Sequence, residues 1–102
     1  MSIESNVVPV LMQISLENAR SLVSTGTCQS MFGLDTEPQS EASASQLAQK
    51  MLGTRNKGLF YYRNEKSERQ ILMVIRDDVG CRSRSWNVSD PELLQVLSIK
   101  PH

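Results

Sequence analysis

The first third of the chain carries its broadest band of apolar residues, between Pro9 and Leu34. Apolar side chains recur there at the spacing of an α-helix, and further ones widen the stripe beyond one helical face. The recurring positions are Val8, Leu11, Met12, Leu16, Ala19, Leu22 and Val23, and the widening ones are Val10 and Ile14. The pattern predicts a long helix from Pro9 to about Ser24, which ends at Gly26 and precedes a short helix over 28–32.

A helix that is apolar over so much of its circumference needs more than one surface to pack against. The residues after Leu34 contain few apolar runs able to cover it. We therefore interpret this stretch as a homodimer interface as well as a core helix. The candidate interface residues are Val8, Leu11, Met12, Ile14, Leu22, Met31 and Phe32.

The middle of the chain changes from a polar loop to a second helix. Residues 35–44 are mostly polar and small, which indicates a linker or a surface loop. Ser43 followed by Gln46 forms a capping-box pattern, which predicts a helix over 44–52. Gly53 stands where a glycine commonly ends such a helix.

After this helix the apolar residues no longer follow a helical period. Two compact runs, 59–62 and 71–75, have the length and the β-branched or aromatic composition of strands. The charged segment 63–70 separates them, so we predict a β-hairpin at 58–76. The alternative is a helix through 66–76.

The last quarter of the chain is expected to be irregular at first and helical at its end. Residues 77–88 show no apolar period, and Gly80 suits a turn. The run Ser-Asp-Pro-Glu at 89–92 combines a cap, a proline and an acid, which indicates a helix over 93–97. The whole pattern predicts a single domain, 1–102, that is mainly α, with a long N-terminal dimerisation helix, short helices, one hairpin and a C-terminal helix.

Charge is balanced over the chain but unevenly distributed along it. Eleven basic and eleven acidic residues give a net charge of zero, which argues against a free-standing nucleic-acid binder. Residues 1–52 hold two basic and five acidic side chains, whereas residues 53–102 hold nine basic and six acidic ones. Any contact with a polyanion is therefore expected in the second half.

That second half contains the one positive signal for chemistry. Phosphate contact needs cations that converge on a backbone, often with Ser hydroxyls and a flat side chain nearby, and the run Cys-Arg-Ser-Arg-Ser-Trp at 81–86 offers these. The candidate DNA-binding residues are Arg55, Lys57, Arg63, Arg69, Arg82, Arg84 and Trp86. Two alternatives stay open: ordinary surface charge on a hairpin, and Trp86 as a core side chain under the last helix.

Catalysis and metal binding have few candidate residues. His102 is the only histidine and is the last residue, and Cys28 and Cys81 lie far apart with no histidine near either. The glycines form no phosphate-binding pattern. We expect no enzyme, no catalytic residue, no metal and no cofactor. The polar first residues and two free thiols indicate a cytoplasmic protein, and no apolar run reaches the length of a membrane span.

The spacing of several residues resembles the FlhD family, the small subunit of a flagellar transcription activator. The resemblance covers the runs 20–23 and 30–34, then Asn56, Leu59, Tyr62 and Arg63, and finally Pro-Glu-Leu-Leu-Gln at 91–95. It implies a dimerising, mainly helical subunit that joins an FlhC-like partner and activates promoters by DNA binding. FlhD-like subunits also serve conjugative plasmids and integrative elements, and this short chain looks closer to that branch.

The chain also departs from the FlhD pattern. The family's cysteine before its aromatic-Arg pair falls at Phe60, so the disulfide associated with that cysteine is not expected, and the family's C-terminal tail has no counterpart here. Zinc belongs to FlhC in that family and is not expected in this chain.

Three functional hypotheses follow. The first is a transcription-activator subunit that forms a homodimer and assists its partner at DNA, in conjugation or flagellar-type regulation. The second is a protein–protein adaptor or anti-activator without DNA contact. The third is a winged-helix repressor with residues 44–52 as recognition helix and 59–75 as wing, which is weakened because that helix carries only Lys50 as a cation.

The dimer hypothesis predicts that Asp at Leu11, Ile14 or Leu22 abolishes assembly before it abolishes helix content. Light scattering and circular dichroism on the same samples would measure the two losses. Equal loss of both would mean that the stripe is only intramolecular core.

Overall fold

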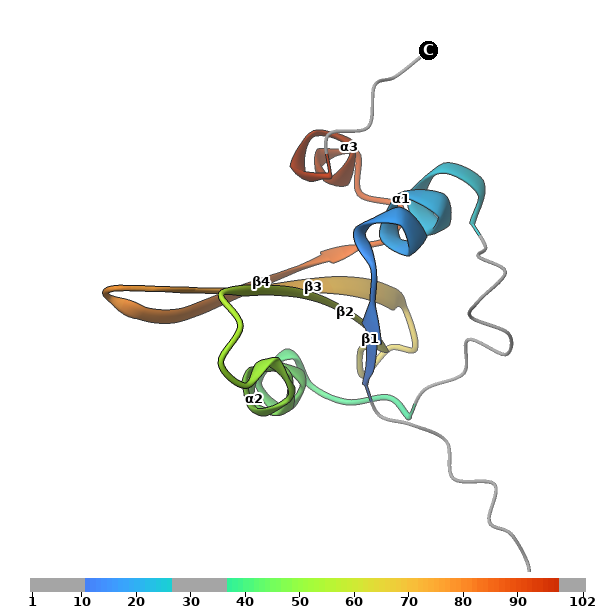
Figure 1. Cartoon of the computed structure of the whole chain (residues 1–102). Coiled ribbons are helices and arrows are strands. Elements are labelled where there is room, and N and C mark those ends of the chain that lie inside the picture. Colours follow the sequence, from blue (N-terminus) through green and yellow to red (C-terminus); the bar gives the residue numbers. More distant parts are fainter. Residues whose placement is uncertain (1–10, 27–36, 98–102) are drawn as a thin grey trace, which may run out of the picture.

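The computed structural model describes residues 11–26 and 37–97, and within them the chain forms a mixed α and β fold. A four-stranded antiparallel sheet has the strand order β1-β2-β3-β4. Helices α1 and α3 lie over one face of this sheet and α2 lies against the other (Figure 1). The elements are β1 (Met12–Ile14), α1 (Leu16–Thr25), α2 (Glu41–Leu52), β2 (Lys57–Arg63), β3 (Arg69–Asp77), β4 (Gly80–Asn87) and α3 (Glu92–Val96).

The prediction of a mainly α fold with a long N-terminal helix is wrong. Residues 12–14 form an edge strand in which Met12 pairs with Tyr61 and Ile14 with Leu59. The helix begins only after Ser15, whose Oγ accepts a hydrogen bond from the backbone N–H of Asn18 at 3.0 Å. A strand followed directly by a capped helix therefore produced the apparent helical spacing. The helix ends at Gly26 as predicted.

Packing on the two faces of the sheet accounts for the breadth of the apolar stripe among the described residues. Leu11 packs with the α2 side of the sheet, whereas Ile14 and Leu22 pack with the α1 and α3 side. All three are buried, and Met12 is partly buried against the same cluster as Ile14. The other proposed interface residues, Val8, Met31 and Phe32, and the short helix at 28–32 lie outside the described residues.

Helix α2 covers one face of the sheet by presenting small residues to it. Its buried positions, Ala44, Ala48 and Leu52, recur every four residues and face the aromatic rings of Phe60 and Tyr62. The helix starts three residues earlier than predicted because Ser40, not Ser43, is its cap: Ser40 Oγ accepts from the backbone N–H of Ser43 at 3.1 Å.

The approach of α2 to the sheet also depends on a glycine. A Cβ at Gly58 would lie 2.8 Å from Leu52 Cδ1 and 3.1 Å from Phe60 Cε1. The absence of a side chain at Gly58 therefore lets the end of the helix pack closely on β2.

The predicted hairpin is confirmed and is longer than expected, whereas the alternative helix over 66–76 is wrong. Strands β2 and β3 pair from Lys57 opposite Ile75 to Arg63 opposite Arg69. The expectation of an irregular segment at 77–88 is also wrong, because β4 continues the sheet with Trp86 opposite Ile71.

The second face of the sheet is closed by both ends of the described chain. Trp86 is 6% exposed and packs in one cluster with Leu22 of α1 and with Leu93 and Leu97 at α3. Arg20 Nε donates a hydrogen bond to the carbonyl oxygen of Leu97 at 2.9 Å, which joins α1 to the end of α3. Trp86 is thus a core side chain, one of the two alternatives that the sequence left open.

We expect Leu22→Ala to lower the free energy of unfolding by about 2–5 kcal/mol, because the truncation leaves a cavity between α1 and the sheet. Leu16→Ala on the same helix is the matched control, since Leu16 is 45% exposed, and a change within about 0.5 kcal/mol is expected. Urea unfolding followed by circular dichroism measures both. A Leu22→Ala protein with unchanged stability but altered oligomeric state would contradict this intramolecular role.

Candidate interaction surface beyond the helices

Strands β3 and β4 continue past the helices as a projecting hairpin (Figure 1). On the α1 and α3 side, the helices cover the part of the sheet that holds Tyr61, Ile71 and Trp86. The same face continues toward the hairpin tip without a covering helix among the described residues. We call this uncovered part the open face and define it by Lys57, Met73, Ile75, Arg82 and Arg84.

The strand register brings these five residues together. Lys57 lies opposite Ile75, and Ile75 lies opposite Arg82 on its other side. The adjacent row on the same face contains Met73 opposite Arg84. A hollow of about 230 Å³ lies between them, lined by Met73, Ile75, Arg82, Ser83, Arg84 and Trp86.

Each arginine of the open face is held in position by a carboxylate. Arg82 Nη2 lies 2.7 Å from Asp77 Oδ2, and Arg84 Nη2 lies 3.0 Å from Glu92 Oε1. The Arg84 guanidinium also stands 5.0 Å from the centre of the Trp86 ring, a cation–π distance. The two arginine side chains are 70% and 63% exposed, so these pairs orient the guanidinium groups without burying them.

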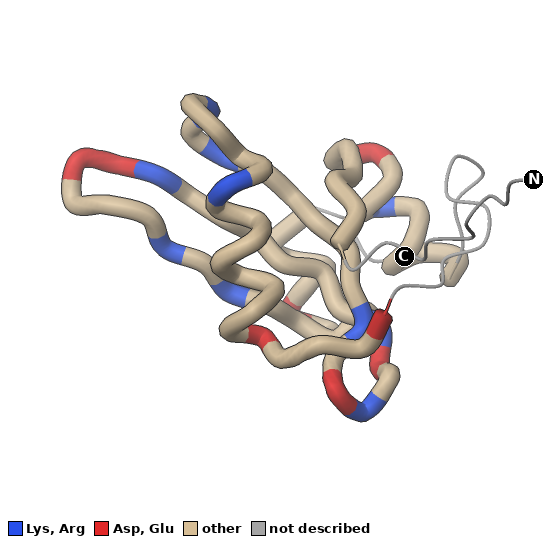
Figure 2. The backbone as a smooth tube through the Cα atoms, turned by 90° about the horizontal axis from the view of Figure 1, so that it is seen from below, with Lys and Arg blue, Asp and Glu red and all other residues tan. Residues whose placement is uncertain are grey.

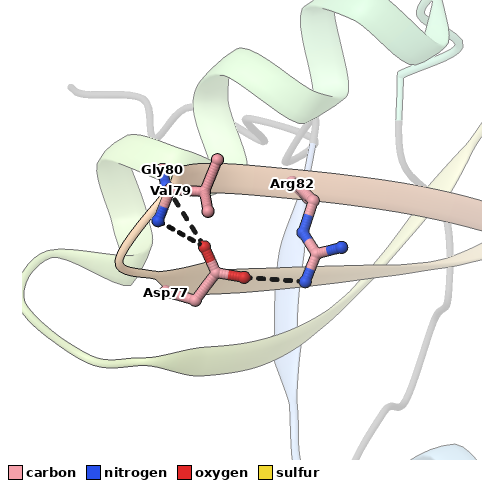
Figure 3. Close-up of polar contacts among 4 residues, drawn as sticks. All are labelled: Asp77, Val79, Gly80 and Arg82. Carbon is pink, nitrogen blue, oxygen red and sulfur yellow. Dashed lines mark hydrogen bonds and ion pairs between the residues drawn. The ribbon is translucent and has the colours of Figure 1, made fainter.

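The hairpin tip is a tight turn built on Asp77 (Figure 3). Asp77 Oδ1 accepts hydrogen bonds from the backbone N–H groups of Val79 at 2.9 Å and Gly80 at 3.2 Å. The bond from Val79 is the largest cause that lowers the pKa of the Asp77 carboxyl, and the bond from Gly80 and the charge of Arg82 lower it further. Val79 is left 92% exposed at the tip.

The candidate DNA-binding residues do not form one surface. Arg55 donates to the carbonyl oxygens of Met51 and Leu52 at the end of α2, and Arg69 donates to the Gly26 carbonyl at 2.7 Å. Arg63 is half-buried at the far end of β2. Basic and acidic positions are interspersed along the chain (Figure 2).

Only part of that candidate set is therefore brought together. Lys57, Arg82 and Arg84 share the open face, and Trp86 lies at its border.

On the opposite face of the hairpin, hydroxyl groups of β4 form hydrogen bonds with α2 and β2. Tyr62 OH and Ser85 Oγ are 3.0 Å apart, and Ser45 Oγ of α2 hydrogen-bonds with Ser83 Oγ. Burial raises the pKa of the Tyr62 hydroxyl above its ordinary value. These contacts fix β4 against α2.

No group of three or more His, Cys, Asp or Glu side chains within the described ranges 11–26 and 37–97 is arranged to hold a metal ion. None of the helices in those ranges is long and apolar enough to cross a membrane.

Comparison with known proteins identifies no relative. No protein-family model matches this chain, and no curated protein or solved structure matches it either.

Two features of this surface were not predicted from the sequence: the exposure of Val79 at the hairpin tip, and the placement of Lys57 and Arg82 on either side of Ile75 in β3. The available signal was the strict alternation of Arg and Ser at 82–85, which is the two-residue period of a strand. This alternation contains no apolar residue, and apolar residues are what usually make a strand recognisable in a sequence.

We expect the Val79 and Gly80 amide protons to report titration of Asp77 with a midpoint below the ordinary aspartate value of about 3.9. Because the pKa of Asp77 is lowered in the folded state, its ionised carboxylate stabilises the turn at pH values above the unfolded-state pKa. This stabilisation is lost as the pH falls through the folded-state pKa. Amide NMR shifts measured against pH test this.

Two variants separate the two roles of Asp77, which accepts the hydrogen bonds of the turn and pairs with the charge of Arg82. Asp77→Asn keeps an acceptor for the turn but loses the charge pair with Arg82, so its amide shifts should be independent of acid pH. Asp77→Ala should shift both amides at every pH. A midpoint at the ordinary aspartate value in the unaltered protein would contradict the proposed cause.

Proposed function

We propose that this protein is a non-catalytic adaptor that binds a partner protein through the open face. The observation that supports this most is the difference between the two faces of the projecting hairpin. On the α2 side Val74 is fully buried, whereas on the open side its neighbour Ile75 is only half-buried beside exposed Lys57, Arg82 and Arg84. An apolar hollow framed by arginines is a common composition of protein interfaces.

The chemistry of the open face indicates what a partner surface would carry. Half-buried Ile75 offers apolar contact area beside the hollow, and Val79 is exposed at the hairpin tip. The guanidinium groups of Arg82 and Arg84 favour carboxylates, which they bind with paired hydrogen bonds. We therefore propose an acidic protein partner. The cytoplasmic location expected from the sequence is part of the same proposal.

A second candidate is the DNA-contacting activator subunit that the FlhD resemblance implies, acting with an FlhC-like partner. Lys57, Arg82 and Arg84 on one face, with Trp86 at its border, favour it, since phosphate contact needs convergent cations. The activator proposal ranks below the adaptor because the mainly α fold that the resemblance implies is not the fold of this chain, which contains a four-stranded antiparallel sheet.

The adaptor proposal is tested by a photo-crosslinking amino acid at position 79, with position 66 as a control at the opposite end of the hairpin strands. A partner crosslinked from position 79 is identified, purified and titrated against the unaltered protein. We expect Arg82→Glu with Arg84→Glu to weaken binding about tenfold or more.

Lys50→Glu with Lys66→Glu is the matched control, because it changes net charge equally on exposed residues away from the open face. This control should bind normally. Equal binding by both double variants would contradict the adaptor proposal.

DNA binding is measured on the same proteins across a salt series. A steep salt dependence that flattens in Arg82→Ala with Arg84→Ala would favour the activator instead.

A further inference from the structure

We propose that the outer edge of β4 accepts an extended segment of the partner as an additional strand, and that this segment carries acidic residues at alternate positions. The inference rests on the proposed adaptor function and names the partner's chemistry and its mode of binding. In this partner segment an acidic residue, any residue and a second acidic residue follow one another. The two acidic residues lie opposite Arg84 and Arg82.

The edge itself follows from the hydrogen-bond pattern of the sheet. Strand β4 lies at the margin of the strand order. The Val88 N–H donates to the Arg69 carbonyl at 2.9 Å, so position 88 and every second residue before it direct their backbone toward β3. Cys81, Ser83 and Ser85 therefore direct their N–H and C=O groups outward. No described residue forms a backbone hydrogen bond with these three outward positions.

The side chains at the outward positions are small and turn away from the open face. Cys81, Ser83 and Ser85 are small and point to the α2 side of the sheet. Two of them are anchored there, Ser83 by Ser45 and Ser85 by Tyr62. A strand that is already ordered loses little entropy when another strand pairs with it.

The arginines argue against a second copy of this chain as the occupant. Residues opposite each other in an antiparallel pair point to the same face. If the Ser83 residues of two copies lie opposite each other across a two-fold axis, then Arg82 of one copy lies opposite Arg84 of the other. If the axis passes through the Arg84 pair instead, the Arg84 side chains of the two copies lie opposite each other. Like charges placed directly opposite each other destabilise a strand pair.

The same geometry favours an acidic strand. Arg82 and Arg84 lie on one face two residues apart, which is the repeat of side chains on one face of an added strand. In its pair with Asp77 or Glu92, each guanidinium uses only Nη2, and it has five N–H donors. Carboxylates on an added strand can therefore bind without breaking the existing pairs.

The test uses a short synthetic peptide with Glu at alternate positions and Thr or Val between them. Two control peptides are matched to it, one with the same composition but consecutive Glu residues and one with Lys in place of Glu. We expect only the alternating Glu peptide to slow hydrogen exchange of the Cys81, Ser83 and Ser85 amides, by about tenfold or more at saturation.

Two double variants and one single variant locate the contact. Arg82→Ser with Arg84→Ser should weaken peptide binding about tenfold, whereas Lys50→Ser with Lys66→Ser should not. Ser83→Pro removes one outward donor and keeps both arginines, since proline is tolerated where the N–H faces away from the neighbouring strand. It should abolish protection of the amides on either side.

Failure of this inference differs from failure of the adaptor proposal. Equal binding of the consecutive Glu peptide, no binding of any peptide, or binding that leaves the three amides unprotected would overturn strand addition. The adaptor proposal would still stand if the crosslinked partner depended on Arg82 and Arg84.

Discussion

The fold depends on a stretch of β2 that is buried on both sides. Leu59, Phe60, Tyr61 and Tyr62 are consecutive, and each is at most 7% exposed. Since neighbouring side chains in a strand point to opposite faces, such a stretch can be stable only when both faces of the sheet are covered. Helix α2 covers one face, and α1 with α3 covers the other. The three-layer arrangement follows from this requirement.

Coverage of the two faces is unequal, and the candidate surface is a result of that inequality. On one side α2 reaches over the hairpin as far as Val74. On the other side α1 and α3 gather over Ile71 and Trp86, and no helix of the described residues covers Ile75, which is flanked by the long cationic side chains of Lys57 and Arg82. Arginine and lysine stems cover apolar area while their charged groups stay in water. The charged residues of the open face thus keep this apolar region in contact with water, and the proposed function assigns them the recognition of the partner as well.

The sequence predicted those parts of the fold that have a strong local signal. The apolar runs of β2 and β3, the end of α1 at Gly26 and the position of α3 were recognisable in this way. Strand β1 was not, because Met12 shares a helical spacing with Leu16 and Ala19 of α1, and the strand partners of β1 lie far ahead in the chain. Strand β4 was missed because Arg and Ser alternate where an apolar residue usually marks one face. The open face could not be predicted without this strand, because Lys57 and Arg82 come onto one face only when β2 and β4 both pair with β3.

The contact between Arg20 and Leu97 has a consequence for how the chain folds. It joins residues 77 positions apart, whereas α2, β2, β3 and β4 contact their neighbours in sequence order. Local contacts form faster than distant ones because less chain entropy is lost in closing the loop. The meander with α2 can therefore assemble while synthesis continues, and β1 can pair with β2 as soon as that strand has formed. The contact of α1 with α3 must wait until α3 has been made. During that interval the apolar face of α1 that packs against α3 stays accessible to other proteins in the cell, chaperones included.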